Sequence, residues 1–163
     1  MISLCHGTGL LVGPVQRERS GERQRGGREG HCQGQSNVTG GDSLIDGVLG
    51  CGVQARTHLE AMREFFPLIR VQAFDVDSKA AFRYASEMTG RFGIDVQVVG
   101  SPQQAVSGSD IVLTAGPITK IPHSTIQPEW LEPGAFATMV DYDAYWHRDA
   151  LRQADKFCTD DTR

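Results

Sequence analysis

Short runs of apolar, largely β-branched residues recur along the chain from about residue 43, and helix-like stretches separate them. This alternation is typical of a parallel α/β sheet, whose strands are buried on both faces and therefore read as continuous apolar runs. The pattern predicts a doubly wound parallel sheet in residues 43–163. The expected strands are residues 44–49, 70–74, 95–99, 110–114 and 135–140.

Apolar residues at helical spacing lie between the first three strands. Leu59, Met62 and Phe66 are expected on the buried face of a first helix. Asp77 or Ser78 is the expected N-cap of a second helix, because their side chains accept hydrogen bonds from free N–H groups of the first turn. The apolar stripe predicted for this second helix consists of Phe82, Ala85 and Met88.

The later part of the chain predicts smaller elements. Ser101-Pro102 opens a third, shorter helix, since proline is favoured in the first turn. Residues 147–157 are expected to form a fourth helix, and residues 157–159 to begin a sixth strand. The stripe of the fourth helix consists of Ala150, Leu151 and Ala154.

The segment before residue 43 has a different character. Residues 16–42 are rich in Arg, Gly and Gln and offer only Cys32 and Val38 to a core. Burial of so few apolar groups does not offset the entropy of ordering the chain. We therefore predict that residues 1–42 are a poorly structured leader, disordered or non-native. A basic arm that binds phosphates is the alternative, although no aromatic residue lies among its arginines.

Charge and cysteine usage narrow the range of partners. The 163-residue chain has a formal net charge of −4, which favours neither a nucleic acid nor an anionic membrane surface. No apolar run approaches the roughly 20 residues that span a bilayer. The four cysteines show no spacing that would hold zinc. We expect a cytoplasmic protein without a metal site.

A glycine-rich turn carries the candidate chemistry. The segment VLGCGVQARTHLEAM places Gly50, Gly52 and Ala55 in a G-x-G-x-x-A arrangement between a strand and a helix. In this arrangement the first glycine permits a tight turn, the second lets a pyrophosphate approach the backbone, and the small third residue lets helix and strand pack closely. The N–H groups of the first helical turn, which includes Val53 and Gln54, then face the phosphates.

Charged side chains near this turn refine the expected cofactor. Arg56 is expected to assist in phosphate binding from the same helical turn. Asp75 ends the second strand, where a carboxylate accepts both ribose hydroxyls of the adenosine half and repels a 2′-phosphate. This favours NAD over NADP, while Arg70 and Lys79 lie near enough in sequence to leave NADP open.

A methyltransferase is the main alternative, because its glycine turn also follows a first strand. Such enzymes usually place an acid two residues before the first glycine and another glycine two residues after the second. This chain has Val48 and Gln54 at those positions, which favours a dinucleotide-binding protein.

Four segments together resemble the ornithine cyclodeaminase and mu-crystallin family. The resemblance covers most of residues 43–161, and Gln54 and His58 beside the glycines are fairly specific to the family. It implies a nicotinamide-binding Rossmann domain inserted into a substrate and dimerisation domain that is made from both ends of the chain. The four segments are GVLGCGVQARTHLEAM, AFDVD, SDIVLTAGPI and VDYDAYWHRDALRQADKFCTDD.

The resemblance also implies that this sequence is incomplete. Family members carry a lysine and arginines in an N-terminal half, where these residues fix the amino-acid carboxylate, and no counterpart is recognisable here. The resemblance therefore implies a truncated Rossmann domain in residues 43–163, inactive alone and lacking the family's dimerisation domain. A leader translated in a shifted reading frame is the hypothesis for residues 1–42.

For a complete member, the resemblance implies hydride transfer between NAD and the α-carbon of an amino acid or a cyclic imine. The fold and cofactor define hydride transfer better than they define the substrate. Ornithine cyclodeamination, alanine oxidation and ketimine reduction stay open, and a non-catalytic, mu-crystallin-like binding module is a further alternative.

Two further groups of site residues are expected at strand ends. Asp141 and Asp143 follow the fifth strand, where the resemblance implies an aspartate that faces the substrate amine and assists proton transfer. Either aspartate is alternatively the cap of the following helix. Thr114, Ala115 and Gly116 end the fourth strand and are assigned to cofactor contact, because small residues allow close approach.

Overall fold

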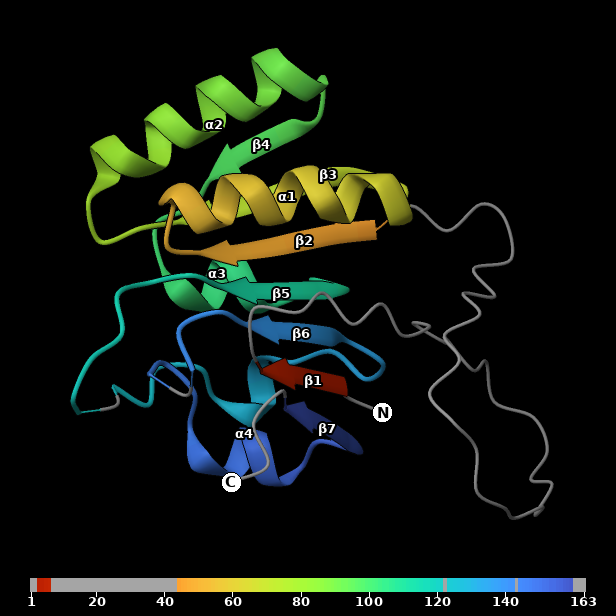
Figure 1. Ribbon diagram of the computed structural model, residues 1–163, viewed down its shortest axis with the longest axis vertical. Coiled ribbons are helices and arrows are strands. Elements are labelled where there is room, and N and C mark those ends of the chain that lie inside the picture. The colour runs from red at the N-terminus through yellow and green to blue at the C-terminus, as the bar shows by residue number, and fades with distance from the viewer. Residues whose placement is uncertain (1–2, 7–43, 122, 143, 160–163) are drawn as a thin grey trace, which may run out of the picture.

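The computed structural model describes residues 3–6, 44–121, 123–142 and 144–159. Its described strands form one sheet in the order β4-β3-β2-β5-β6-β1-β7, and all neighbouring strands run parallel (Figure 1). The predicted parallel sheet is thus confirmed. The strands are β1 (Ser3–His6), β2 (Leu44–Leu49), β3 (Leu68–Phe74), β4 (Asp95–Val98), β5 (Ile111–Thr114), β6 (Phe136–Met139) and β7 (Lys156–Thr159).

Helices cover both faces of the sheet, as expected for a doubly wound fold. On one face, α1 (Val53–Phe65) and α2 (Ser78–Phe92) bury apolar side chains against β2 and β3. On the other face lie α3 (Pro102–Val106), the 3-10 helix η1 (Pro128–Trp130) and α4 (Arg148–Arg152). Every residue of β5 and β6 is buried, so the middle of the sheet is the core.

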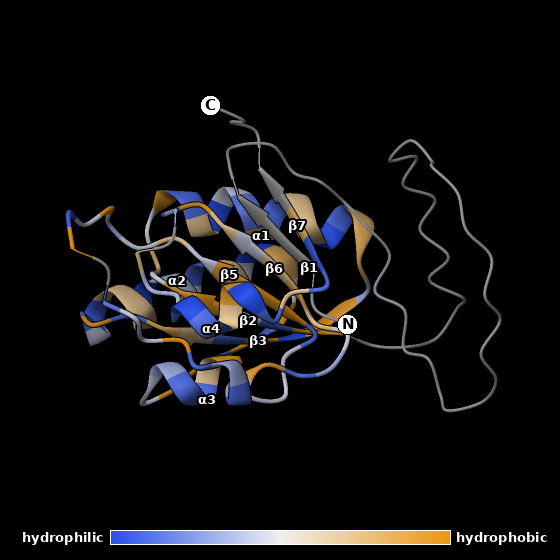
Figure 2. Ribbon diagram, turned by 90° about the horizontal axis from the view of Figure 1, so that it is seen from below, coloured by the Kyte–Doolittle hydropathy of each residue, from blue (hydrophilic) through white to orange (hydrophobic). Residues whose placement is uncertain are grey.

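Hydropathy follows these layers. Figure 2 shows hydrophobic colouring along the central strands β2 and β5 and hydrophilic colouring on much of the helix surface. Among the described residues, no helix is long and apolar enough to cross a membrane.

The predicted helix ends are explained by local side chains. Asp77 caps α2 by accepting a hydrogen bond from the Lys79 N–H at 3.0 Å, and the Ser101 hydroxyl accepts one from the Gln104 N–H at the start of α3. Phe66 is buried as predicted but lies just outside α1, with extended backbone angles. The helix ends there because a residue that precedes proline disfavours the helical conformation.

The stripe predicted for α2 is wrong at Phe82, which is 64% exposed. Residues spaced strictly three apart drift around a helix that has 3.6 residues per turn, so Phe82 leaves the buried face. Spacing by three and four residues keeps one face. The buried residues of α2 are Ala81, Tyr84, Ala85 and Met88.

Both ends of the described chain differ from the prediction. Residues 3–6 form β1, although no strand was expected before residue 44, and the rest of the predicted leader lies outside the described residues. The expected helix over 147–157 ends at Arg152, whereas the strand expected to begin over 157–159 is confirmed as β7, which spans Lys156–Thr159. This strand pairs with β1, and the two segments are remote in sequence.

A buried acid lies in the middle of the sheet. Asp46 of β2 is fully buried, and neither of its carboxylate oxygens has a hydrogen-bond partner among the described residues. It lies two residues from Val48, which packs with α1 and α2, and therefore shares that face. Burial disfavours the charged form and raises the pKa of Asp46 from 3.8 to about 7.

This pKa predicts a pH-dependent stability. Above the unfolded-state pKa the folded chain retains a proton that the unfolded chain loses, so the free energy of unfolding falls as pH rises from about 4 to about 7. The shift corresponds to a contribution of up to about 4 kcal/mol. Asp46→Asn removes this contribution. Urea unfolding of both proteins across this pH range measures the difference.

At pH about 4 the acid is largely protonated in the folded state and begins to ionise only in the unfolded state, so the difference between the two proteins there serves as the internal reference. We expect the Asp46→Asn variant to gain stability relative to the wild type as pH rises. A constant difference across the range would contradict an uncompensated buried acid.

Candidate dinucleotide-binding site

The glycine turn lies at the carboxyl end of β2, between this strand and α1 (Figure 1). Gly50 has φ +88°, a conformation that side chains rarely adopt, and its N–H donates to the Phe74 carbonyl at 2.9 Å. A Cβ atom on Gly50 would lie 2.7 Å from the carbonyl carbon of Ala115 and from the amide nitrogen of Gly116. The turn therefore touches the segment after β5, backbone against backbone.

Gly52, in contrast, faces open space. A Cβ atom on Gly52 would meet nothing within 4 Å, and its φ of −83° is ordinary. No side chain caps the start of α1, where Val53 and Gln54 are exposed. Ala55 is fully buried with the core residues of β2 and β3, as expected for its small side chain. The open cradle and the uncapped helix start fit a pyrophosphate.

Asp75 follows β3 directly and lies beside this turn. Its Oδ2 accepts the Cys51 N–H at 2.7 Å, and its Oδ1 accepts the Asp77 N–H at 2.8 Å. A carboxylate oxygen accepts more than one hydrogen bond, so both oxygens keep capacity for ribose hydroxyls. Arg70 lies toward the opposite end of β3 and pairs with Asp95 at 3.2 Å, which removes it from the ribose region.

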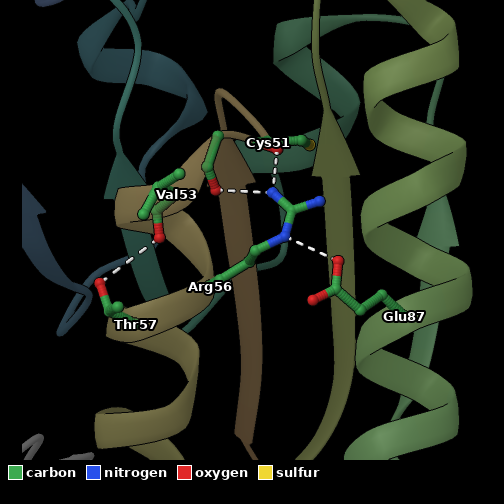
Figure 3. A network of polar contacts seen from close by, with 6 residues as sticks. Cys51, Val53, Arg56, Thr57 and Glu87 are labelled. Carbon is green, nitrogen blue, oxygen red and sulfur yellow. Dashed lines mark hydrogen bonds and ion pairs between the residues drawn. The ribbon is translucent and has the colours of Figure 1, made fainter.

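Arg56 is arranged differently from the prediction that it assists the phosphates. Its Nη1 donates to the carbonyl oxygens of Cys51 and Gly52, at 2.7 and 2.8 Å, and its Nε donates to Glu87 of α2 at 2.8 Å (Figure 3). The guanidinium therefore binds carbonyl oxygens of the turn and not the side of its N–H groups, where a phosphate would lie.

Asp141 connects the ends of β5 and β6. Its carboxylate is buried and accepts hydrogen bonds from the Thr114 hydroxyl at 2.7 Å and from the Gly116 N–H at 3.0 Å. It is not the cap of α4, because His147 fills that position. Asp143 lies outside the described residues, and a proton-transfer role of either acid stays a prediction.

Two aromatic residues that the sequence analysis missed complete this side of the site. The Trp146 indole donates to the Thr114 hydroxyl at 3.1 Å. The Tyr145 hydroxyl donates to the Pro117 carbonyl at 3.0 Å, and a Cβ atom on Gly116 would lie 2.6 Å from the Tyr145 ring. Burial, and then the charges of Asp141 and Asp75, raise the pKa of Tyr145. The sequence signal that could have found them is a pair of adjacent aromatic residues, Tyr145 and Trp146, shortly after Asp141 at the end of a strand.

The Cys51 thiol does not suit nucleophilic chemistry. Burial, reinforced by the charge of Asp75, raises its pKa to about 12, although Arg56 opposes this, so the reactive thiolate is scarce at neutral pH. Within the described ranges, no three or more His, Cys, Asp or Glu side chains are grouped to hold a metal ion. The glycine turn, Asp75 and the segment after β5 thus meet at the carboxyl ends of β2, β3 and β5, where parallel α/β sheets place their ligands.

Most of this chain matches a known protein family. The profile of the Ornithine cyclodeaminase/mu-crystallin family matches residues 40–163. The chain belongs to this family. The resemblance inferred from the four sequence segments is thereby confirmed.

Curated relatives in the family have several activities in their names. Alanine dehydrogenase of Archaeoglobus fulgidus is 34% identical over 102 residues, which cover 63% of this chain and 30% of that protein. Ketimine reductase mu-crystallin of Macropus fuliginosus is 36% identical over 93 residues, which cover 57% of this chain and 27% of that protein. The chain therefore spans about a third or less of the length of these relatives.

Solved structures similar to this chain include dinucleotide complexes. The Δ1-pyrroline-2-carboxylate reductase of Thermococcus litoralis, in complex with NADH and L-proline, is 30% identical with a TM-score of 0.62, and the match covers 69% of this chain and 35% of that one. An archaeal alanine dehydrogenase dimer with bound NAD is 33% identical with a TM-score of 0.52, covering 59% and 28%.

The two glycines of the turn predict different effects on stability. Gly50→Ala forces a Cβ atom against backbone and places alanine at positive φ, which should cost about 2–4 kcal/mol. Gly52→Ala has an open Cβ position and should change stability by less than about 1 kcal/mol. Thermal or urea unfolding measures both, and equal losses in the two variants would contradict the described turn.

Proposed function

We propose that the described region is the NAD-binding part of an oxidoreductase of this family, in which a hydride passes between the cofactor and the α-carbon of an amino acid or cyclic imine. One arrangement carries the proposal: the open cradle at Gly52, the uncapped start of α1 and the Asp75 carboxylate meet at the switch point of the sheet. The predicted cofactor is supported by two solved relatives that hold NADH and NAD.

The residues of this chain have separate tasks in the proposed site. Amide N–H groups at the start of α1 bind the pyrophosphate, and Asp75 accepts the hydroxyls of the adenosine ribose. The nicotinamide half then extends to the side of β5 and β6, where the Tyr145 ring packs against Gly116. Bound NAD supplies the hydride acceptor. Asp141 accepts a hydrogen bond from the Gly116 N–H, and we assign to it the assistance of proton transfer.

The substrate is an amino acid or an imine in this proposal. Relatives named alanine dehydrogenase, ketimine reductase and ornithine cyclodeaminase support this class without distinguishing its members. Cyclodeamination is one outcome of the same hydride step. A cytoplasmic location belongs to this proposal as well.

Binding without turnover is the second candidate, because the cofactor assignment rests on several residues of the glycine turn and on Asp75, whereas the catalytic assignment rests on Asp141. A substrate-dependent change in NADH absorbance tests for turnover by this chain. Turnover of an amino acid or imine would favour the enzyme and contradict the prediction that the chain is inactive alone, whereas NADH binding without turnover is compatible with both functions.

We predict that the chain binds NADH and that Gly52→Ala weakens binding by at least about 10-fold, because the added methyl group enters the pyrophosphate cradle. Fluorescence titration gives the two dissociation constants. Unfolding curves provide the control, since this variant should retain its stability. Unchanged NADH affinity in the variant would contradict the position of the pyrophosphate.

The cofactor preference gives a separate prediction. The wild-type chain should bind NADH more tightly than NADPH, because Asp75 repels a 2′-phosphate. Asp75→Asn keeps the side-chain size and removes the charge, so the ratio of the NADPH to the NADH dissociation constant should fall by about 10-fold. Parallel titrations measure this ratio. Tighter NADPH binding by the wild type would overturn the assignment.

A further inference from the structure

Arg56 is held at three points around the glycine turn. Its guanidinium bonds to two carbonyl oxygens of the turn and to Glu87, and its Cζ lies 5.6 Å from the centre of the Tyr84 ring. The Arg56 side chain is only 23% exposed. One planar, five-donor group thus connects the turn to α2, which a lysine ammonium does not reproduce.

Two oppositely charged side chains bind the backbone N–H and the backbone carbonyl of Cys51. The Cys51 N–H donates to the Asp75 carboxylate, and the Cys51 carbonyl accepts from the Arg56 guanidinium, at 2.7 Å in both cases. The Gly52 carbonyl accepts from the same Arg56 nitrogen. These bonds orient two successive carbonyl groups of the turn toward Arg56, as the close view shows for the residues it labels (Figure 3).

We propose that Arg56 is a positioning residue for dinucleotide binding, which holds the carbonyl groups of Cys51 and Gly52 on the side of α2 and so keeps the phosphate cradle open toward the cofactor. This inference rests on the proposed function. Carbonyl oxygens carry partial negative charge, so a carbonyl that turned toward the pyrophosphate would repel it. A cradle ordered in advance also lowers the entropy cost of binding.

The charge of Arg56 is compensated by the groups around it. Glu87 lies 2.8 Å from its Nε, and the two turn carbonyls occupy its Nη1. Arg56 therefore acts through the turn backbone and not as a free cation that contacts phosphate directly.

A matched ion pair elsewhere provides the control. Arg91 of α2 pairs with Glu60 of α1 at 2.8 Å. This pair joins the same two helices as Arg56 and Glu87, but here the arginine belongs to α2 and the glutamate to α1. No hydrogen bond connects Arg91 to the glycine turn among the described contacts. Loss of Arg91 removes the helix–helix ion pair and a contact with the Phe92 ring but leaves the turn in place, whereas loss of Arg56 also releases the turn.

The experiment compares Arg56→Met, Arg56→Lys and Arg91→Met by NADH titration and thermal unfolding. We expect Arg56→Met to weaken NADH binding by about 10-fold, because the bonds to both carbonyl groups are lost. We expect Arg56→Lys to weaken it by about 3-fold, because one ammonium group does not reproduce the bonds to the turn and to Glu87 together. Arg91→Met should bind NADH within about 2-fold of the wild type. If Arg56→Met does not fold, Arg56→Lys and Arg91→Met still give the comparison.

Salt distinguishes positioning from direct phosphate contact. Salt screens an exposed charge–phosphate attraction, so a loss that shrinks at high salt would overturn positioning, whereas a constant ratio of wild-type to variant affinity supports it. Equal affinities for all proteins, or equal losses in the Arg56 and Arg91 variants, would also overturn it. A wild type that does not bind NADH at all would instead refute the proposed function.

Discussion

The glycine turn meets the segment after β5 backbone against backbone at Gly50, and the arrangement of the strand ends depends on this contact. A side chain at Gly50 would push these two segments apart. The same β5 segment is held from the other side by Asp141, through the Gly116 amide and the Thr114 hydroxyl. The ends of β2, β5 and β6 therefore form one connected unit, and a ligand that spans the switch point meets a surface whose parts are ordered together.

The parts of the fold that were predictable from sequence are those decided locally. Continuous apolar runs, the capping side chains of Asp77 and Ser101, and the glycine turn each act within a few residues, so the central strands and the first three helices were found near their predicted positions. What was missed depends on remote partners. Strand β1 pairs with β6 and β7, and a four-residue strand far from its partners carries no signal that distinguishes it from a loop.

The same division applies to the candidate site. The positions of Gly50, Gly52 and Asp75 follow from the order strand, turn, helix, strand, because parallel strands end at one edge of the sheet. The partners of Arg56 do not follow, since Glu87 is 31 residues away and its approach depends on how α2 packs. The buried environment of Asp141 and the position of Tyr145 over Gly116 likewise arise only when the loops after β5 and β6 meet.

The place of β1 in the sheet has a consequence for the order in which the sheet assembles. This strand lies between β6 and β7, and the whole series of elements from β2 to η1 separates it in sequence from both neighbours. Closing so long a loop is entropically costly, and pairings between remote segments form slowly. The half of the sheet around β2, β3 and β4 has its strands close in sequence, so this half is able to form before β1 and β7 pair at the opposite edge.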